Sequence, residues 1–238
     1  MYSRPSSRPR ESVAGDWRSP LPTEKTRVYL DAVERAEIGY GMFSVSLDEA
    51  LGYRRSGKLQ KAYQALGVAP ALCLRFTTPL LHLLRAMTRH ARHFGTTPTL
   101  APLNPRNFQN ARSQRVARMN GLFGRVLLSQ RAQFNHKLVA LAELVEDLGK
   151  SFCELVGDLG EEDCLDPDQR WEALDANHYD LNTCLREAVV LLKCFLHAIP
   201  EAQLEEFTIS LQEKPEKVRQ PRALPHLAHR RLTPLKGQ

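Results

Sequence analysis

Aspartate and glutamate are missing from a long internal part of this sequence. No acidic side chain occurs from Ala50 to Ala142, a stretch of 93 residues that carries 15 lysines and arginines. The next 71 residues, Glu143 to Glu213, reverse the balance, with 18 acidic residues against four basic ones. We call these two segments the acid-free stretch and the acidic block. Oppositely charged helices can select which partner they pack against and in which orientation, so the two blocks predict a charge-matched helical pairing.

Signatures of membranes, disulfides and catalysis are also missing. No apolar run approaches the 18 or more residues of a membrane span, so no transmembrane segment is expected, and no secretory leader is expected from the arginine- and proline-rich start. Five cysteines without a Cys-x-x-Cys pair favour reduced thiols in a cytoplasmic protein. The common phosphate-loop, serine-nucleophile and zinc-protease motifs do not occur. The sequence therefore predicts no enzyme activity, no cofactor and no metal site.

The net charge of +6 comes from the two ends of the chain. Without them, Ser19–Glu213 holds 22 basic and 24 acidic residues, so the charge alone does not argue for nucleic acid. Both ends lack apolar periodicity and are rich in proline. We predict disordered tails at residues 1–23 and 214–238, and one helical domain at residues 24–213.

Abundant leucine, with little valine, isoleucine or tyrosine, favours helix over strand throughout that domain. A first helix begins at Thr23 or Glu24 and weakens at Gly39 and Gly41. The capping-box pattern Ser46-Leu-Asp-Glu49 then predicts a new helix that ends near Leu66.

Five residues of the segment ALGYRRSGKLQKAYQAL are spaced as in a known repeat: Ala50, Tyr53, Gly57, Ala62 and Leu66. The segment resembles the helix–turn–helix of one tetratricopeptide repeat. This resemblance implies two helices that pack through small residues around a turn at the glycine. No second copy follows at an offset of 34 residues, as a solenoid would need, so one helix or a simple helix pair is the alternative.

The remaining helices are predicted from apolar spacing and from breaks. A helix over 71–94 contains Pro79, and the proline- and asparagine-rich segment 95–110 is a candidate hinge. Two rows of mostly apolar residues, spaced alternately three and four positions apart, then follow, and we call them seams. The first runs from Val116 to Leu159 and the second from Trp171 to Ile199. The first predicts one long coiled-coil-like helix from about Ala111, about 70 Å long if unbroken. Asp166-Pro167 is a helix start, and a short helix is expected over 201–212.

Together these patterns predict an all-α protein, an elongated antiparallel helical bundle with a long coiled-coil-like helix and disordered tails. Basic residues recur on one side of the long helix, with two phenylalanines as packing anchors. These eight residues form the candidate interaction surface: Arg106, Arg112, Arg115, Arg118, Arg125, Arg131, Phe123 and Phe134. We therefore predict a non-catalytic interaction or scaffold protein whose ligand is a protein partner or a second copy of the chain.

Two alternative functions follow from other residues. His178 lies on the second seam, and His136 lies in the similar segment Gln-Phe-Asn-His-Lys-Leu138. A histidine in a helical bundle can serve as a phosphoacceptor in a signalling protein. An open basic face can instead bind nucleic acid or another anionic surface, with an affinity that falls steeply with salt. No nucleic-acid-binding motif accompanies the arginines, and few aromatic residues are available to stack on bases.

Overall fold

The structure is a computed structural model that describes residues 24–91, 100–127, 129–160 and 166–199. All regular elements in these ranges are helices, which confirms the predicted all-α class. They are α1 (Glu24–Arg55), α2 (Leu59–Leu66), α3 (Ala69–His90), the 3₁₀ turn η2 (Pro105–Asn107), α4 (Ala111–Val126), α5 (Gln130–Leu159) and α6 (Pro167–Ala198). The predicted tails and the helix expected over 201–212 lie outside the described residues.

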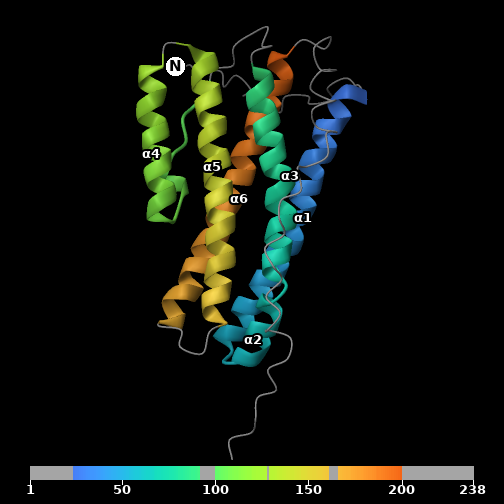
Figure 1. Cartoon of the computed structure of the whole chain (residues 1–238), viewed down its shortest axis with the longest axis vertical. Coiled ribbons are helices and arrows are strands. Elements are labelled where there is room, and N and C mark those ends of the chain that lie inside the picture. The colour runs from blue at the N-terminus through green and yellow to red at the C-terminus, as the bar shows by residue number, and fades with distance from the viewer. Residues whose placement is uncertain (1–23, 92–99, 128, 161–165, 200–238) are drawn as a thin grey trace, which may run out of the picture.

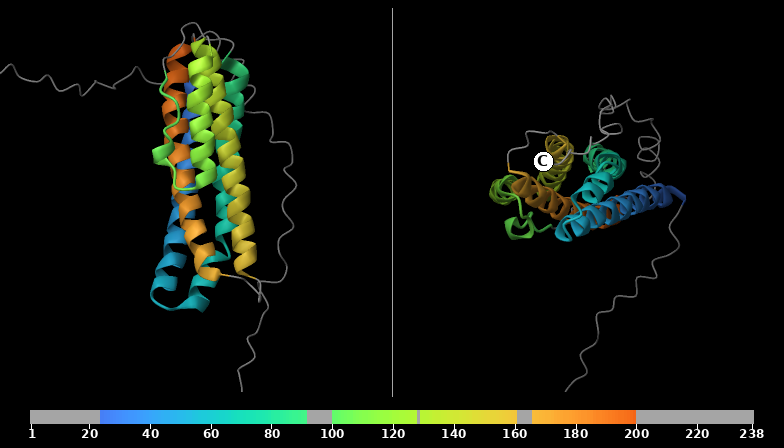
Figure 2. Two further views of the ribbon diagram at one scale, coloured as in Figure 1. Left: turned by 90° about the vertical axis from the view of Figure 1, so that its left-hand side faces the viewer. Right: turned by 90° about the horizontal axis from the view of Figure 1, so that it is seen from below.

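The four long helices α1, α3, α5 and α6 lie lengthwise along one another (Figure 1). In chain order each runs opposite to the one before it. Helix α1 packs on α3, α3 on α5 and α5 on α6, and α6 returns to contact α1. The short α2 lies at one end, below α1 and α3, whereas α4 lies outside the four and packs along α5 (Figure 2).

Aromatic side chains from three of the long helices meet in the centre of the core. The rings of Phe43 in α1 and Phe152 in α5 meet edge to face at 4.8 Å, and Phe43 also stacks on Phe76 of α3. Farther along, Phe134 of α5 stacks on Phe195 of α6 with ring centroids 6.3 Å apart. All five of these phenylalanines are fully buried, and each such ring stabilises the fold by about 1.5–3 kcal/mol through its removal from water.

Helix α1 is continuous from Glu24 to Arg55, so the predicted weakening at Gly39 and the restart at Ser46 are wrong. Gly39 marks a close contact between helices, because a Cβ atom there would lie 3.1 Å from the Cα atom of Phe76 in α3. The Ser46 hydroxyl does not cap a helix; it donates to the carbonyl oxygen of Ala65 at 3.2 Å. Packing against α3 and α2 outweighs the low helix propensity of the glycine.

The long helix predicted from Ala111 to Leu159 is in fact two helices. Helix α4 ends at Val126, Leu127 is extended, and α5 begins at Gln130. The Ser129 hydroxyl caps α5 by accepting a hydrogen bond from the backbone N–H of Ala132 at 3.1 Å. The chain reverses at this point, so α4 lies beside the first half of α5 and does not extend it.

Other local predictions are confirmed. Helix α6 begins at Pro167, and the Asp166 carboxylate accepts from the backbone N–H of Gln169 at 3.1 Å. Between α1 and α2, Gly57 has φ +72°, a left-handed conformation that glycine adopts without strain. The helix–turn–helix form implied by the repeat resemblance is therefore present, although its first helix is the end of the much longer α1.

One segment is long and apolar enough to cross a membrane by length and composition. It is Leu59–His90, whose most apolar 18-residue window has a mean hydropathy of 1.3 and is 39% buried in the structure. This finding differs from the expectation of no transmembrane segment that was drawn from the sequence. Interior helices of soluble proteins meet the same criterion, and here the segment comprises α2 and the core helix α3.

Candidate interaction surface

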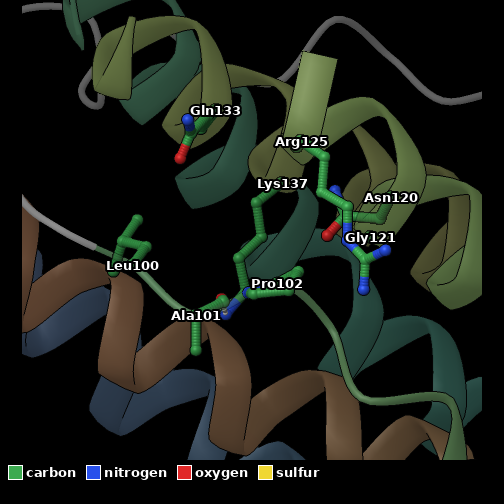
Figure 3. A pocket seen from close by; sticks show the side chains of 9 residues that line it. Leu100, Ala101, Pro102, Asn120, Gly121, Arg125, Gln133 and Lys137 are labelled. Carbon is green, nitrogen blue, oxygen red and sulfur yellow. Dashed lines mark hydrogen bonds between the residues drawn. The ribbon is translucent and has the colours of Figure 1, made fainter. Parts of the chain in front are cut away.

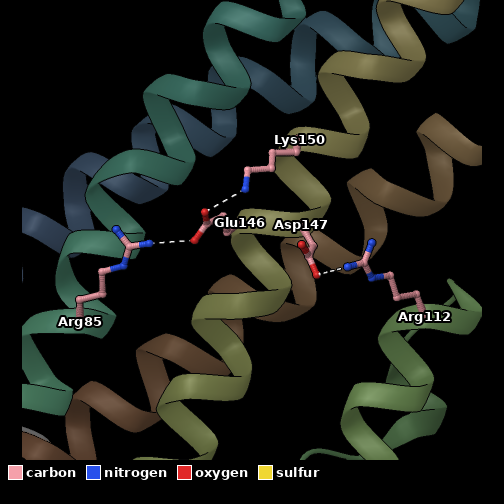
Figure 4. A network of polar contacts seen from close by, with 5 residues as sticks. All are labelled: Arg85, Arg112, Glu146, Asp147 and Lys150. Atoms are coloured by element: carbon pink, nitrogen blue, oxygen red, sulfur yellow. Dashed lines mark hydrogen bonds and ion pairs between the residues drawn. The ribbon is translucent and has the colours of Figure 1, made fainter. Parts of the chain in front are cut away.

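Within the described residues, four ion pairs join the acid-free stretch to the acidic block. Two start from consecutive residues of α5: Glu146 pairs with Arg85 of α3 at 2.8 Å, and Asp147 pairs with Arg112 of α4 at 2.7 Å (Figure 4). Lys150 also donates to Glu146, and this hydrogen bond is the main reason that the pKa of Glu146 lies below its usual value. The other two pairs are Arg54–Asp168 at 2.6 Å and Lys137–Glu187 at 2.7 Å. A substantial part of the charge match is thus satisfied within the chain.

Lys137 is the most deeply buried of these cations, with 5% of its surface exposed. Besides its pair with Glu187 of α6, its ammonium group donates to the carbonyl oxygen of Ala101 at 3.0 Å. Figure 3 shows the side chain reaching from α5 towards this backbone, at the edge of a cavity of about 260 Å³. Lys137 therefore connects α5, α6 and the segment that precedes α4, and its charge is used inside the fold.

The segment before α4 is held by a second buried polar network. The Asp180 carboxylate in α6 is fully buried and accepts from the backbone N–H groups of Gln109 at 2.6 Å and Asn110 at 3.0 Å. The Asn110 side chain donates to the same carboxylate at 2.9 Å and to Asn177 at 3.0 Å. Of the predicted hinge over 95–110, the described part is therefore fastened to α6, and residues 95–99 lie outside the described residues.

The outer face of α4 exposes large apolar side chains. We call four of them, at helical spacing, the α4 apolar stripe: Met119, Leu122, Phe123 and Val126. Their exposed fractions run from 43% for Met119 to 73% for Val126. Such a row on a helix surface is typical of a protein-binding site.

A groove of about 420 Å³ lies between α4 and α5, next to the stripe. We call it the α4–α5 groove. Met119 and Phe123 line it from α4, and His136 and Val139 line it from α5. Arg112 and Arg115 lie at one end of the groove, and Glu143 lies opposite them on α5. The groove thus combines an apolar part with a basic edge and an acidic edge.

The predicted arginines do not form one continuous face. Arg112 and Arg115 border the groove, and Arg118 donates to Gln114 on the neighbouring side of α4. Arg125 lines the cavity near Lys137. The other two predicted arginines belong to other elements, Arg106 to η2 and Arg131 to the first turn of α5.

The two predicted aromatic anchors differ in their surroundings. Phe123 is 47% exposed and lies 5.2 Å from the His136 ring, between centroids. Phe134 is fully buried against Phe195 and does not reach the surface, so its assignment to an exposed interaction surface is wrong. Apolar periodicity cannot distinguish these roles, because both residues occupy positions of the same seam.

His136 is held in one tautomer by its neighbour. The Asn120 side-chain oxygen accepts from the backbone N–H of Leu103 at 3.0 Å, so its amide group donates to His136 Nδ1 at 2.8 Å. In the neutral ring the proton then resides on Nε2. The lone pair needed for attack on phosphorus is the one engaged by Asn120, an arrangement that does not favour phosphoryl transfer.

His178 is half-buried and fastens α6 to α1. Its Nε2 atom lies 2.8 Å from the Tyr40 hydroxyl and 3.0 Å from the Ser44 hydroxyl, and its ring stacks on Tyr40. Burial lowers the pKa of His178 and raises the pKa of Tyr40 to about 12. The neighbouring carboxylates of Asp48 and Asp175 would repel a phosphoryl group.

Ser44 and His178 also have the spacing of a nucleophile and a general base, but the backbone around Ser44 offers no free N–H group to an oxyanion. Ser44 lies within α1, where the backbone N–H groups are used by the helix itself. Its hydroxyl also donates to Asp48 at 3.4 Å. We interpret this cluster as a polar contact between helices.

The described cysteines are free thiols, and burial raises the pKa of Cys73 and Cys184. Cys164 lies outside the described residues. Among the residues that the structure covers, no three histidine, cysteine or acidic side chains are grouped as metal ligands. No family model, curated protein or solved structure matches the chain. Of the α4 apolar stripe, the sequence prediction included Phe123 in the interaction surface and omitted Met119, Leu122 and Val126.

Proposed function

We propose that this chain is a non-catalytic interaction protein, an antiparallel helical bundle whose working surface is the outer face of α4. The observation that carries this proposal is the exposed α4 apolar stripe. It accompanies exposed arginines on α4, a helix that packs outside the four long helices along α5. A protein partner or a second copy of the chain would cover this face.

The internal ion pairs support this choice of surface. Arg54, Arg85 and Lys137 of the acid-free stretch are paired with carboxylates of the acidic block, so part of the basic charge of this stretch serves the fold. Arg115, Arg118 and the α4 apolar stripe remain exposed. Covering the stripe would remove these apolar side chains from water, which is the main driving force of most protein association.

Site-specific photo-cross-linking tests the proposal. A photoreactive phenylalanine analogue placed at Leu122 on α4 is expected to give one discrete cross-linked product in native extract or with purified chain. The same analogue at Val190, an equally exposed apolar position on α6, is the matched control and is expected to give none. Mass spectrometry of the product separates a partner protein from a second copy of the chain.

The variant Phe123→Asp supplies the second control. It places a charge within the exposed stripe without removing a buried side chain, so the fold should be retained and the Leu122 product lost. Equal cross-linking from Leu122 and Val190, or a Leu122 product that survives Phe123→Asp, would rule out α4 as the working surface.

A further inference from the structure

We propose that the α4–α5 groove binds an amphipathic helix of a partner protein, and that this helix carries carboxylates along the edge that faces α4. The proposal rests on the proposed function of α4 as the working surface. It adds the chemical character and the orientation of the partner.

The shape of the groove suits one helix. The α4 residues that line the groove run from Arg112 to Phe123, a rise of about 16 Å or about three turns, which a helix of about 14 residues covers. Phe123 and Met119 on one wall and Val139 on the other present apolar side chains between the two edges. A helix that inserts apolar residues at steps of three and four would cover them, as in other helix-in-groove complexes.

The charges at the groove are asymmetric. Arg112 and Arg115 border it on the α4 side and both are exposed. Arg112 already pairs with Asp147, so Arg115 is the cation that remains for a ligand. Glu143 borders it on the α5 side. A carboxylate on the partner helix is therefore stabilised at the α4 edge and repelled at the α5 edge, which fixes the rotation of that helix about its axis.

The same features disfavour nucleic acid as the occupant. A phosphate backbone would meet the Glu143 carboxylate, and the exposed side chains of Met119, Leu122 and Val126 would gain nothing from a charged strand. Phe123 is the exposed aromatic residue of α4, and one ring cannot stack several successive bases as a single-strand-binding surface does.

The test measures fluorescence anisotropy of a labelled 14-residue helical peptide with the full chain. The peptide has leucines at steps of three and four, glutamates along one flank and alanines elsewhere; a control peptide has lysines in place of the glutamates. We expect the glutamate peptide to bind at least tenfold more tightly than the lysine peptide. We expect Arg115→Glu to lower the affinity for the glutamate peptide at least tenfold and Glu143→Gln to raise it.

The opposite affinity changes expected for Arg115→Glu and Glu143→Gln distinguish recognition at one edge of the groove from general electrostatic attraction. Lys193→Glu, at an exposed position on α6, changes the net charge as Arg115→Glu does and should leave the affinity unchanged. Circular dichroism of each variant verifies that the helices are intact. Equal losses in Arg115→Glu and Lys193→Glu, absence of peptide binding, or displacement of the peptide by a single-stranded oligonucleotide would overturn the proposal.

A second possible occupant is tested in the same assay. Residues 201–213 of this chain also combine glutamates with Leu204, Phe207 and Leu211 at heptad spacing. If Glu205→Lys with Glu206→Lys in the full chain raises the peptide affinity more than tenfold, this segment occupies the groove and the assignment to a partner fails. Failure of every peptide with persistent cross-linking at Leu122 would reject this inference alone and leave the proposed function standing.

Discussion

Glu146 and Asp147 are consecutive residues of α5, yet they bind cations on two different helices. Glu146 faces Arg85 of α3, and Asp147 faces Arg112 of α4. Neighbouring positions on a helix differ by about 100° in direction, so one acidic dipeptide can serve both sides of α5. This relationship shows how the acidic block organises the acid-free stretch around it.

The exposed and buried ion pairs should differ in their effect on stability. Arg85→Met removes an exposed cation and should cost less than about 1 kcal/mol. Lys137→Met leaves the Glu187 carboxylate and the Ala101 carbonyl oxygen without their partner, and should cost about 3 kcal/mol. Urea unfolding of the two variants measures both values. Similar costs for the two would show that burial does not set the strength of these pairs.

Gly39 and Gly41 form a matched pair within α1. Gly39→Ala would place a methyl group 3.1 Å from a backbone atom of Phe76 and should destabilise the fold by about 1–3 kcal/mol. At Gly41 there is open space, so Gly41→Ala should stabilise it by about 0.5–1 kcal/mol. Thermal unfolding compares the two variants. The same sign for both would contradict the close approach of α1 and α3.

Asp180 should control the segment that precedes α4. Asp180→Ala removes the acceptor for the N–H groups of Gln109 and Asn110 and should cost about 1–3 kcal/mol for each donor left buried. Hydrogen exchange resolved by residue should show lost protection at these two amides, with protection retained in the middle of α5. Unchanged exchange at Gln109 and Asn110 would show that the segment is held by other contacts.

His178 should make stability depend on pH. Burial lowers its pKa in the folded protein below the value of about 6.5 in the unfolded chain. Below that pH the unfolded chain binds the proton more readily, so the contribution of the neutral histidine is present above about pH 6.5 and is lost as the pH falls through the folded pKa.

The comparison uses His178→Gln, which retains polar atoms for the hydroxyls of Tyr40 and Ser44. The free energy of unfolding of the original chain should fall more steeply between pH 7.5 and 5.5 than that of the variant. His82, whose pKa is lowered by burial and by Arg85 and Arg89, is present in both proteins and cancels in the difference. Parallel pH profiles would show that His178 is not responsible.

Features that depend on neighbouring residues in the chain were predictable from the sequence. The start of α6 at Asp166-Pro167 follows from side-chain capping and a fixed proline φ, both of which act within one turn. The turn at Gly57 and the buried seams of α5 and α6 are local or periodic in the same way.

Features that depend on contacts between distant segments were not predictable from the sequence. Leu127 and Ser129 reverse the chain inside an unbroken apolar pattern, because the pattern records which residues are apolar and does not record which surface each of them meets. The exposure of Phe123 and the burial of Phe134 follow from that reversal. From the sequence, a glycine at position 39 is expected to weaken the helix, and only its distance to Phe76 reveals its packing role.

The separation of charge along the chain has a consequence for the order of synthesis. Arg54 pairs with a residue 114 positions later, and Arg85 with one 61 positions later. The emerging polypeptide therefore displays a long cationic segment before any of its carboxylate partners has been made. The ion pairs that join α1, α3 and α4 to the second half of the chain can form only after α5 and α6 leave the ribosome. These three helices therefore cannot complete their ion pairs in the order in which they are synthesised.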